Sequence, residues 1–213
     1  MPYFKNNNVN LLLIHIPKTG GTSLEKYFSE KFNINLDNNS VFGKNFLYKK
    51  IKVYAYLQHI LYKTILNNKD IFNINDHNLK ILTVVRNPYN KIISDLFYFK
   101  FINKNSSPEY VFNMLKKFIK TPSINVDNHN LPQYLFIQTN GIIDKRIQIL
   151  HTETLTQDMI KLGYTDFNLK LNVNNNTNKN YFRYLNNDSI KLINLYYSKD
   201  FELFNYKKII TDK

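Results

Sequence analysis

The stretch NLLLIHIPKTGGTSLEKYF, residues 10–28, decides the fold. Residues 11–16 form a continuous apolar run, which is typical of a strand buried on both faces of a parallel sheet. A turn with adjacent glycines follows, and residues 23–32 then have the spacing of an amphipathic helix. A buried strand, a glycine turn and a helix in this order predict the first unit of an α/β domain.

The same order recurs along the chain. Residues 81–85 form a second apolar strand, which runs through Arg86, Asn87 and Pro88 into a predicted helix with Lys91 on its outside. Hydrophobic spacing predicts six more elements: strands at 52–57 (the weaker one) and 146–150, and helices at 60–66, 110–119, 154–162 and 189–204. We therefore predict a single domain over residues 1–213, with a mainly parallel sheet flanked by helices.

Composition excludes several classes of protein. A chain of 213 residues, 43% of them hydrophobic, is long enough to bury a core of its own. The absence of cysteine excludes a disulfide scaffold, a thiol nucleophile and a cysteine metal site. The apolar runs are too short to span a bilayer, and the N-terminus lacks the layout of a signal peptide. We expect no membrane span and a cytoplasmic location, in a bacterium or in the host of a phage or virus.

The net charge of +13 comes almost entirely from lysine, because only 3 of the 29 cationic residues are arginine. Asparagine fills 34 positions, and asparagine-rich tracts at 6–8, 38–40 and 172–180 are expected to be loops. A protein that binds nucleic acid would be expected to use arginine, because its planar guanidinium group can donate two hydrogen bonds to guanine or to phosphate. A nucleic-acid partner is therefore disfavoured, although the lysine-rich surface leaves an acidic ligand open.

The first turn has the residues of a phosphate site. Gly20 and Gly21 allow backbone angles at which successive N–H groups converge on one anion. Thr22 and Ser23 open the helix with hydroxyls and free N–H donors, and Lys18 adds a full charge. This is not a Walker A loop, because there the lysine follows the second glycine.

The segment HIPKTGGTSLEKYF, residues 15–28, resembles the 5′-phosphosulfate loop of sulfotransferases that use 3′-phosphoadenosine 5′-phosphosulfate (PAPS), especially the carbohydrate branch. The resemblance implies a PAPS-binding relative of the P-loop kinase fold, with 3′-phosphoadenosine 5′-phosphate (PAP) as product and no metal. It implies that Lys18 contacts the oxygen that bridges sulfate and phosphate. The residues that would wrap the 5′-phosphate are Thr19, Gly20, Gly21, Thr22 and Ser23.

The second turn, in TVVRNPYNKIISDLFYF at 83–99, resembles the 3′-phosphate site of the same family. Arg86 and Ser94 would bind one phosphate together, and Asn87 replaces the usual aspartate. Two phosphate sites favour PAPS over ATP, because a kinase has no use for a 3′-phosphate. A kinase would also need acidic magnesium ligands, and the strand at 81–85 ends without them.

Later segments match the family in order: LPQYLFIQTNG at 131–141, RIQILHTETLTQDMIKLG at 146–163 and LYYSKDFELFNY at 195–206. In the last segment, we expect the final helix to pack against the rest of the domain through Asp200, Phe201 and Phe204. Glu153 keeps an acidic position of the family pattern, but we assign it no catalytic role.

Sulfuryl transfer needs a base that takes the proton of the acceptor hydroxyl. His59, in YLQHILYKTI at 56–65, resembles the Gly-His segment that carries the base in several carbohydrate sulfotransferases. It is our first choice, with a carboxylate or His151 as the alternatives. His15 is expected to be a packed strand residue, and His77 and His129 lie in asparagine-rich loops without an apparent partner.

We thus expect a PAPS-dependent sulfotransferase of the EC 2.8.2 type that acts on a sugar, a polysaccharide or another hydroxyl-bearing acceptor, possibly an acidic one. Two alternatives stay open. One is an ATP-dependent kinase of the related P-loop fold. The other is a catalytically inactive homologue that binds nucleotide or nucleic acid.

Overall fold

The structure, a computed structural model, describes residues 1–36, 47–48, 51–52, 56–168 and 181–211. Its main sheet has the order β1 (Tyr3–Lys5), β2 (Asn10–Ile14), β5 (Lys80–Val85) and β8 (Ile147–His151). β2, β5 and β8 are parallel, and β1 runs antiparallel to β2. The mainly parallel α/β sheet is confirmed, with its three clear strands within two residues of the predicted bounds; β1 was not predicted.

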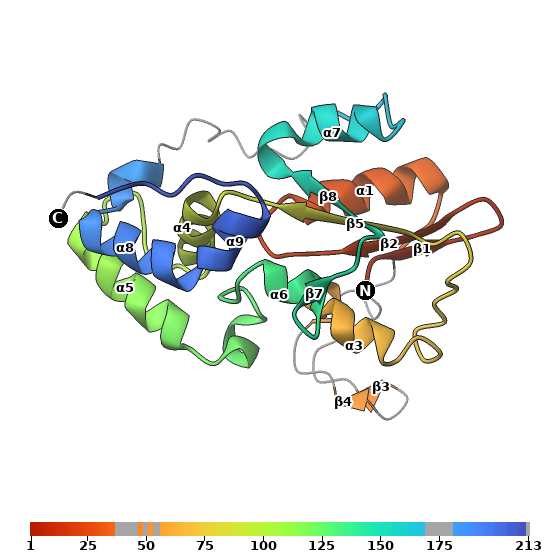
Figure 1. The fold of residues 1–213 in the computed structure, drawn as a ribbon, viewed down its shortest axis with the longest axis horizontal. Helices are drawn as coiled ribbons and strands as arrows, with labels where there is room; N and C mark the ends of the chain where they lie inside the picture. The colour runs from red at the N-terminus through yellow and green to blue at the C-terminus, as the bar shows by residue number, and fades with distance from the viewer. Residues whose placement is uncertain (37–46, 49–50, 53–55, 169–180, 212–213) are drawn as a thin grey trace.

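Helices cover both faces of this sheet (Figure 1). α1 (Gly21–Phe32) and α7 (Leu155–Lys161) lie on one face, and α3 (Tyr62–Leu66) and α6 (Tyr134–Ile137) lie on the other. Successive side chains of a strand point to opposite faces, so β2 supplies Leu11 and Leu13 to the first core and Leu12 and Ile14 to the second. The run of leucines is therefore buried on both sides, as its lack of alternation predicts.

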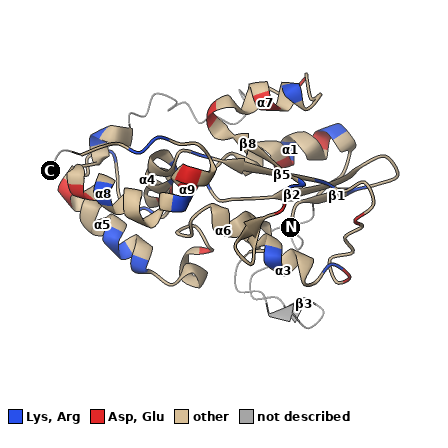
Figure 2. Ribbon diagram, in the orientation of Figure 1, with Lys and Arg blue, Asp and Glu red and all other residues tan. Residues whose placement is uncertain are grey.

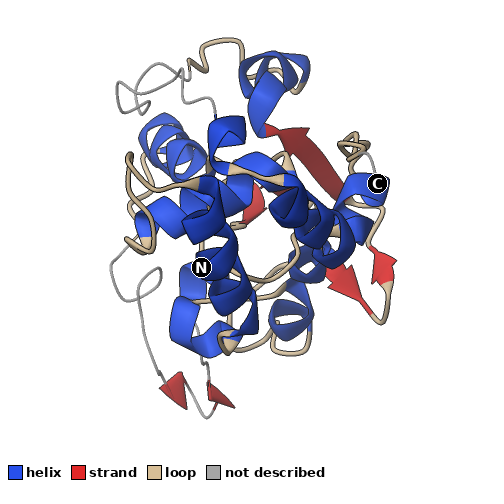
Figure 3. Ribbon diagram, turned by 90° about the vertical axis from the view of Figure 1, so that its left-hand side faces the viewer, coloured by secondary structure: helices blue, strands red, loops and turns tan. Residues whose placement is uncertain are grey.

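A third core belongs to a group of helices beyond the carboxyl ends of the parallel strands. The group contains α4 (Pro88–Tyr98), α5 (Pro108–Lys120), α8 (Asn187–Tyr196) and α9 (Ser198–Leu203). Figure 3 shows the molecule from this end, with helices in front and strands behind them. In parallel sheets ligands bind where the strands end, so this helix group faces the expected site.

Short elements complete the described chain: β3 (Leu47–Tyr48), β4 (Ile51–Lys52), β6 (Gln138–Thr139), β7 (Ile142–Ile143) and 3-10 turns at Leu57–His59, Ser123–Val126, Thr152–Thr154 and Tyr181–Tyr184. The predicted strand at 52–57 is wrong at its end, because Leu57 begins a 3-10 turn; residues 53–55 lie outside the described part. The tracts at 38–40 and 172–180 also lie outside it.

The predicted helix at 189–204 is two helices, α8 and α9, which meet at Tyr197. The ring of Tyr197 is buried, and its hydroxyl donates to the Asn130 carbonyl oxygen at 3.1 Å. The break turns Asp200 and Phe201 into the interior, where both are buried. Apolar periodicity alone could not show this break, because apolar residues continue on both sides of it.

Lysines and arginines lie on the helices and loops around the molecule, with acidic residues between them (Figure 2). This distribution supports the view that most of the positive charge is simply solvated. Within the described ranges, none of the helices combines the length and the apolar character needed to cross a bilayer.

Candidate functional site

One pocket, of about 480 Å³, lies where β2 and β5 end and α1 and α4 begin. It brings together both predicted phosphate turns and the predicted base. Thr19 and Gly21 belong to the first turn but do not line the pocket. The lining residues are His15, Lys18, Gly20, Thr22, Ser23, His59, Arg86, Ser94, Tyr98 and His129. We call Lys18, Gly20, Thr22, Ser23, Arg86 and Ser94 the donor wall, and His15, His59, Tyr98 and His129 the histidine wall.

The backbone of the first turn is shaped for an anion. Lys18 has φ of 61° and Gly20 has φ of 104°, both in the left-handed region. A non-glycine residue in that region is held at a cost of about 1–2 kcal/mol, which is typical of functional turns. Gly20 is the N-cap of α1, and no side chain caps this helix end. The first N–H groups of α1 and the positive end of its dipole therefore face the pocket beside Thr22 and Ser23.

His15 ties this turn to the interior. A Cβ on residue 21 would overlap the His15 ring, so only glycine fits there. His15 Nδ1 lies 2.5 Å from Glu25 Oε1, and Gln58 Nε2 donates to Glu25 Oε2 at 2.7 Å. Burial raises the pKa of Glu25, but the charge and hydrogen bond of His15 and the bond from Gln58 outweigh it and lower the pKa below its usual value. His15 is packed, as predicted, but it follows the last residue of β2 rather than lying in the strand, and it also lines the pocket.

The second turn places Arg86 and Ser94 on the same pocket. Asn87 caps α4, because its side chain accepts from Tyr89 N at 3.0 Å, so asparagine fills the capping position here. Arg86 Nη1 donates to the Lys18 carbonyl oxygen at 3.0 Å, which joins the two turns directly. Glu153 Oε1 accepts a hydrogen bond from Asn87 N at 2.9 Å, so Glu153, the acidic residue of the family pattern, stabilises this turn.

His59 is the third part of the site. It is only 7% exposed and ends a 3-10 turn. Its Nδ1 lies 2.6 Å from Asp127 Oδ2, and Asp127 Oδ1 accepts from Tyr56 N at 2.6 Å. Because a carboxylate only accepts, Nδ1 carries the proton and Nε2 is left as the basic nitrogen. Burial lowers the pKa of His59 to about 4, against the raising effect of Asp127, so the ring is neutral near pH 7.

The expectation that His129 has no partner is wrong. Its Nδ1 lies 2.8 Å from Asp95 Oδ1, and both residues are buried. Lys91, expected on the outside of its helix, is 1% exposed; it donates to Asp95 Oδ2 at 2.9 Å and to the His129 carbonyl oxygen at 2.7 Å. An ammonium ion and a carboxylate can share the interior here because each has its hydrogen-bonding partners.

The histidines form a row. The ring centroids of His15 and His59, and of His59 and His129, are each 5.0 Å apart in edge-to-face contact. Tyr98 stacks on His129 at 5.1 Å, and the Lys18 ammonium lies 4.6 Å from the centre of the Tyr98 ring. The row thus reaches from β2 to the lysine of the donor wall.

Sequence reasoning missed the carboxylates behind this row. One signal was available: Glu25 lies beside Leu24 and Phe28 on the apolar face of its helix, and Asp95 lies similarly on α4. A charge on a buried helix face requires a buried partner. Asp127 offered no such signal, because it lies in a turn.

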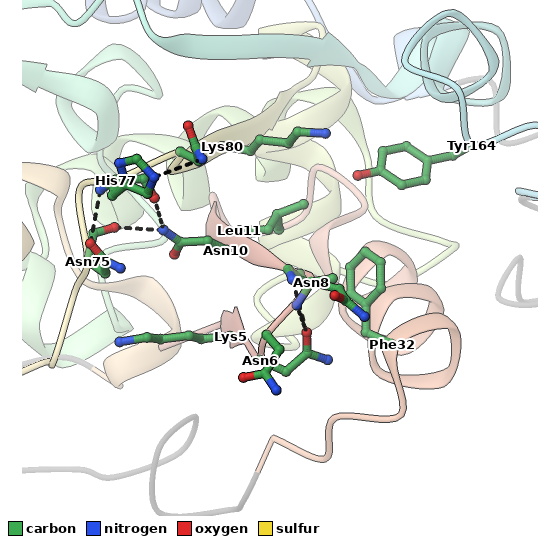
Figure 4. A pocket seen from close by; sticks show the side chains of 13 residues that line it. Lys5, Asn6, Asn8, Asn10, Leu11, Phe32, Asn75, His77, Lys80 and Tyr164 are labelled. Atoms are coloured by element: carbon green, nitrogen blue, oxygen red, sulfur yellow. Dashed lines mark hydrogen bonds between the residues drawn. The ribbon is translucent and has the colours of Figure 1, made fainter.

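The other two histidines lie elsewhere. His151, the alternative base, does not line the pocket; its Nε2 lies 3.2 Å from the Phe204 carbonyl oxygen. His77 lines a second pocket at the opposite, amino-terminal end of the strands, with Asn10 and Lys80 (Figure 4). There Asn10 Nδ2 donates to the carbonyl oxygens of Asn75 and His77 at 2.8 and 2.7 Å. These amide donors are used to hold turns, so this pocket is a poor candidate for the functional site.

His59, Asp127 and His129 offer ligand atoms within 4.8 Å of one another, so this group could hold a metal ion. However, both oxygens of Asp127 already accept hydrogen bonds at 2.6 Å, one of them from His59 itself. A metal ion would have to replace these bonds. That the reaction needs no metal stays a prediction.

One of three comparisons with known proteins finds a match. The family model described as the sulfotransferase family matches residues 1–207, nearly the whole chain. No curated protein and no solved structure matches the sequence. The parallel sheet flanked by helices is consistent with the P-loop-like fold of that family. Because the family model covers nearly its full length and the fold is consistent with that family, the chain belongs to the sulfotransferase family, the enzymes of the EC 2.8.2 class.

Proposed function

We propose that this sulfotransferase, acting as one domain over residues 1–213, uses PAPS as donor and sulfates a hydroxyl group of a sugar or polysaccharide. One observation carries the proposal. Two separate turns that carry cations and hydroxyl groups, around Lys18 and around Arg86, line the same pocket as a buried histidine whose Nδ1 faces a carboxylate. A donor with phosphates on the 3′ and 5′ oxygens of its ribose, and an acceptor proton to remove, would use all three features.

The donor wall fits a nucleotide with two phosphate groups. Its donors are backbone N–H groups, the hydroxyls of Thr22, Ser23 and Ser94, and the cations of Lys18 and Arg86. Among the described residues, the lining holds no carboxylate. A magnesium-dependent kinase would need carboxylates there, so the donor set favours PAPS over ATP.

Bound PAPS would supply a sulfuryl group, whose bond to the bridging oxygen breaks as the acceptor oxygen bonds to sulfur. His59 Nε2 takes the proton of the acceptor hydroxyl, and Asp127 holds the ring in the required tautomer. Lys18 lies on the leaving side and neutralises the charge that develops on the phosphate oxygen. Burial keeps the His59 ring unprotonated at ordinary pH, and Asp127 favours the charged ring that forms when Nε2 takes the proton.

The sugar acceptor is supported by Tyr98. Its ring is 59% exposed at the rim of the pocket and stacks on His129 within the histidine wall. An amphipathic aromatic ring that contacts the neighbour of the base is a suitable surface for a sugar ring, which presents C–H groups on its faces and hydroxyls at its edge. An acidic sugar would also be attracted by the lysine-rich surface.

Calorimetry with PAP in the absence of magnesium tests the donor half of the proposal. We expect binding to the wild type and a loss of at least about tenfold in affinity for Lys18→Ala and Arg86→Ala, because each removes a charge-assisted contact. Binding of magnesium–ATP in preference to PAP would identify a kinase instead.

Transfer of labelled sulfate from PAPS to a panel of neutral and acidic polysaccharides tests the acceptor half. We expect label on at least one polysaccharide. Binding of PAP without transfer to any hydroxyl acceptor would indicate the inactive homologue.

A further inference from the structure

A buried glutamine holds the backbone of Arg86. Gln133 Oε1 accepts from Arg86 N at 2.8 Å, and Gln133 Nε2 donates to the Arg86 carbonyl oxygen at 2.8 Å. Arg86 follows the last residue of β5, so its own peptide groups lie past the strand ladder. The Gln133 amide supplies the hydrogen bonds that a neighbouring strand would otherwise make to Arg86. The Gln133 side chain is 0% exposed.

Asp200 fixes the orientation of that amide. Its Oδ2 accepts from Gln133 N at 2.8 Å and from Gln133 Nε2 at 3.4 Å, and its Oδ1 accepts from Tyr134 N at 2.9 Å. A carboxylate cannot donate to the amide oxygen, so the amide nitrogen must face Asp200 and the amide oxygen is left for Arg86 N. Burial raises the pKa of Asp200 to about 6, while the two backbone N–H groups and Lys91 favour its charged form.

The chain of contacts continues from Arg86 to the other turn, because the Arg86 guanidinium donates to the Lys18 carbonyl oxygen at 3.0 Å. α9 is thus connected to the donor wall through Asp200, Gln133 and Arg86. The guanidinium can keep one position only if the peptide groups from which it extends are fixed. Here both are bound by one side chain, whose own amide is bound by a buried carboxylate.

We propose that Gln133 is the positioning residue for recognition of the 3′-phosphate, holding Arg86 in place with its amide oriented by Asp200. The inference rests on the proposed function, in which Arg86 binds that phosphate. It predicts that loss of the amide lowers the preference for a nucleotide with a 3′-phosphate, rather than nucleotide binding in general.

The test is the ratio of the dissociation constants of AMP, which lacks the 3′-phosphate, and PAP, measured by calorimetry. For the wild type we expect PAP to bind about 10- to 100-fold more tightly. In Gln133→Met, which keeps the length of the side chain without its hydrogen bonds, we expect the ratio to fall about tenfold or more. AMP affinity should change less than about twofold, and Gln138→Met, a substitution in the β6–β7 hairpin, should leave the ratio unchanged.

Arg86→Met provides the lower limit of the ratio, and adding Gln133→Met to it should change nothing further, because the two residues act through one contact. An unchanged ratio in Gln133→Met, or an equal loss of AMP and PAP affinity, would overturn the inference. If Gln133→Met does not fold, the same ratio is measured for Asp200→Asn, because this substitution removes the carboxylate that holds the Gln133 amide. A preserved preference for PAP over AMP in that variant would again overturn the inference. A wild type that does not prefer PAP contradicts the proposed function itself.

Discussion

The two walls of the pocket are built by different means. The donor wall consists of two turns, the first with left-handed residues and an uncapped helix end, and of half-exposed cations, and each turn is continuous in sequence. The histidine wall consists of the exposed ring of Tyr98 and three buried histidine rings, each with its Nδ1 on a carboxylate from another segment. An anion site needs N–H donors and positive charge, which a turn can supply. A proton-transfer site needs a fixed tautomer and a desolvated ring, and these require partners from several segments.

The largest expected effect is in the histidine wall. His59→Ala should lower kcat by about 10²- to 10⁴-fold, since a positioned base contributes that much. PAP affinity should stay within about twofold of wild type, because the donor wall is intact. Labelled-sulfate transfer to the identified acceptor and calorimetry measure the two quantities. His151→Ala is the matched control, because His151 lies outside the pocket, and we expect it to leave kcat within about threefold. Near-normal turnover in His59→Ala would remove His59 from the mechanism.

The second effect concerns the carboxylate behind the base. Asp127→Asn should lower kcat on the order of 10²-fold, because an amide can turn its N–H₂ group toward Nδ1 and favour the wrong tautomer. Asp166→Asn is the control, since Asp166 pairs with Tyr27 and Lys31 on the surface and is not among the residues that line the pocket. Equal loss in both variants would assign the effect to stability rather than to the tautomer.

The contrast between the walls also explains what the sequence could predict. The parallel strands and the glycine turn follow from local order, because neighbouring residues determine turn geometry and helix starts. Arg86 and Ser94 do not, because only the resemblance to the family's 3′-phosphate site points to them. The pairing of His59 with Asp127 spans 68 positions, and that of His129 with Asp95 spans 34. No local pattern encodes such pairs, since tertiary packing brings them together. For that reason the sequence predicts an unpartnered His129. Lys91 is a different case, because its partner Asp95 lies four positions further along the same helix.

A third prediction targets the donor wall. Gly20→Ala should lower PAP affinity about tenfold, because φ of 104° is strained for alanine and relief of the strain moves the N–H groups of the turn. Gly163→Ala is matched to it, with φ of 90° and no atom within 4 Å of the added Cβ. Both variants should lose a similar amount of thermal stability, measured by calorimetric unfolding, but only Gly20→Ala should bind PAP weakly. Weakened binding in both would show that the turn has no special role.

A smaller effect is expected where the two walls meet. Tyr98→Leu should lower kcat/KM about two- to fivefold. The substitution removes the cation–π contact between the Lys18 ammonium and the Tyr98 ring, and an exposed contact of this kind contributes about 0.5–1 kcal/mol. Tyr98→Phe keeps the ring and should behave like wild type. A loss in Tyr98→Phe equal to that in Tyr98→Leu would show that the hydroxyl matters and that the contact with Lys18 does not.

The smallest expected effect is a pH response that is nearly flat. Because burial lowers the pKa of His59 to about 4, the ring stays neutral as pH falls from 7.5 to 5.5, and kcat at saturating PAPS should change less than about twofold. A base at the ordinary histidine pKa of about 6.5 would instead lose roughly tenfold, because its proton-accepting form becomes the minor one at pH 5.5. NMR titration of the His59 ring protons separates the two cases, with the urea-unfolded chain as the reference for unperturbed rings. A His59 midpoint near that reference would mean that burial does not set the protonation state of the histidine wall, and the contrast between the walls would then rest on hydrogen bonds alone.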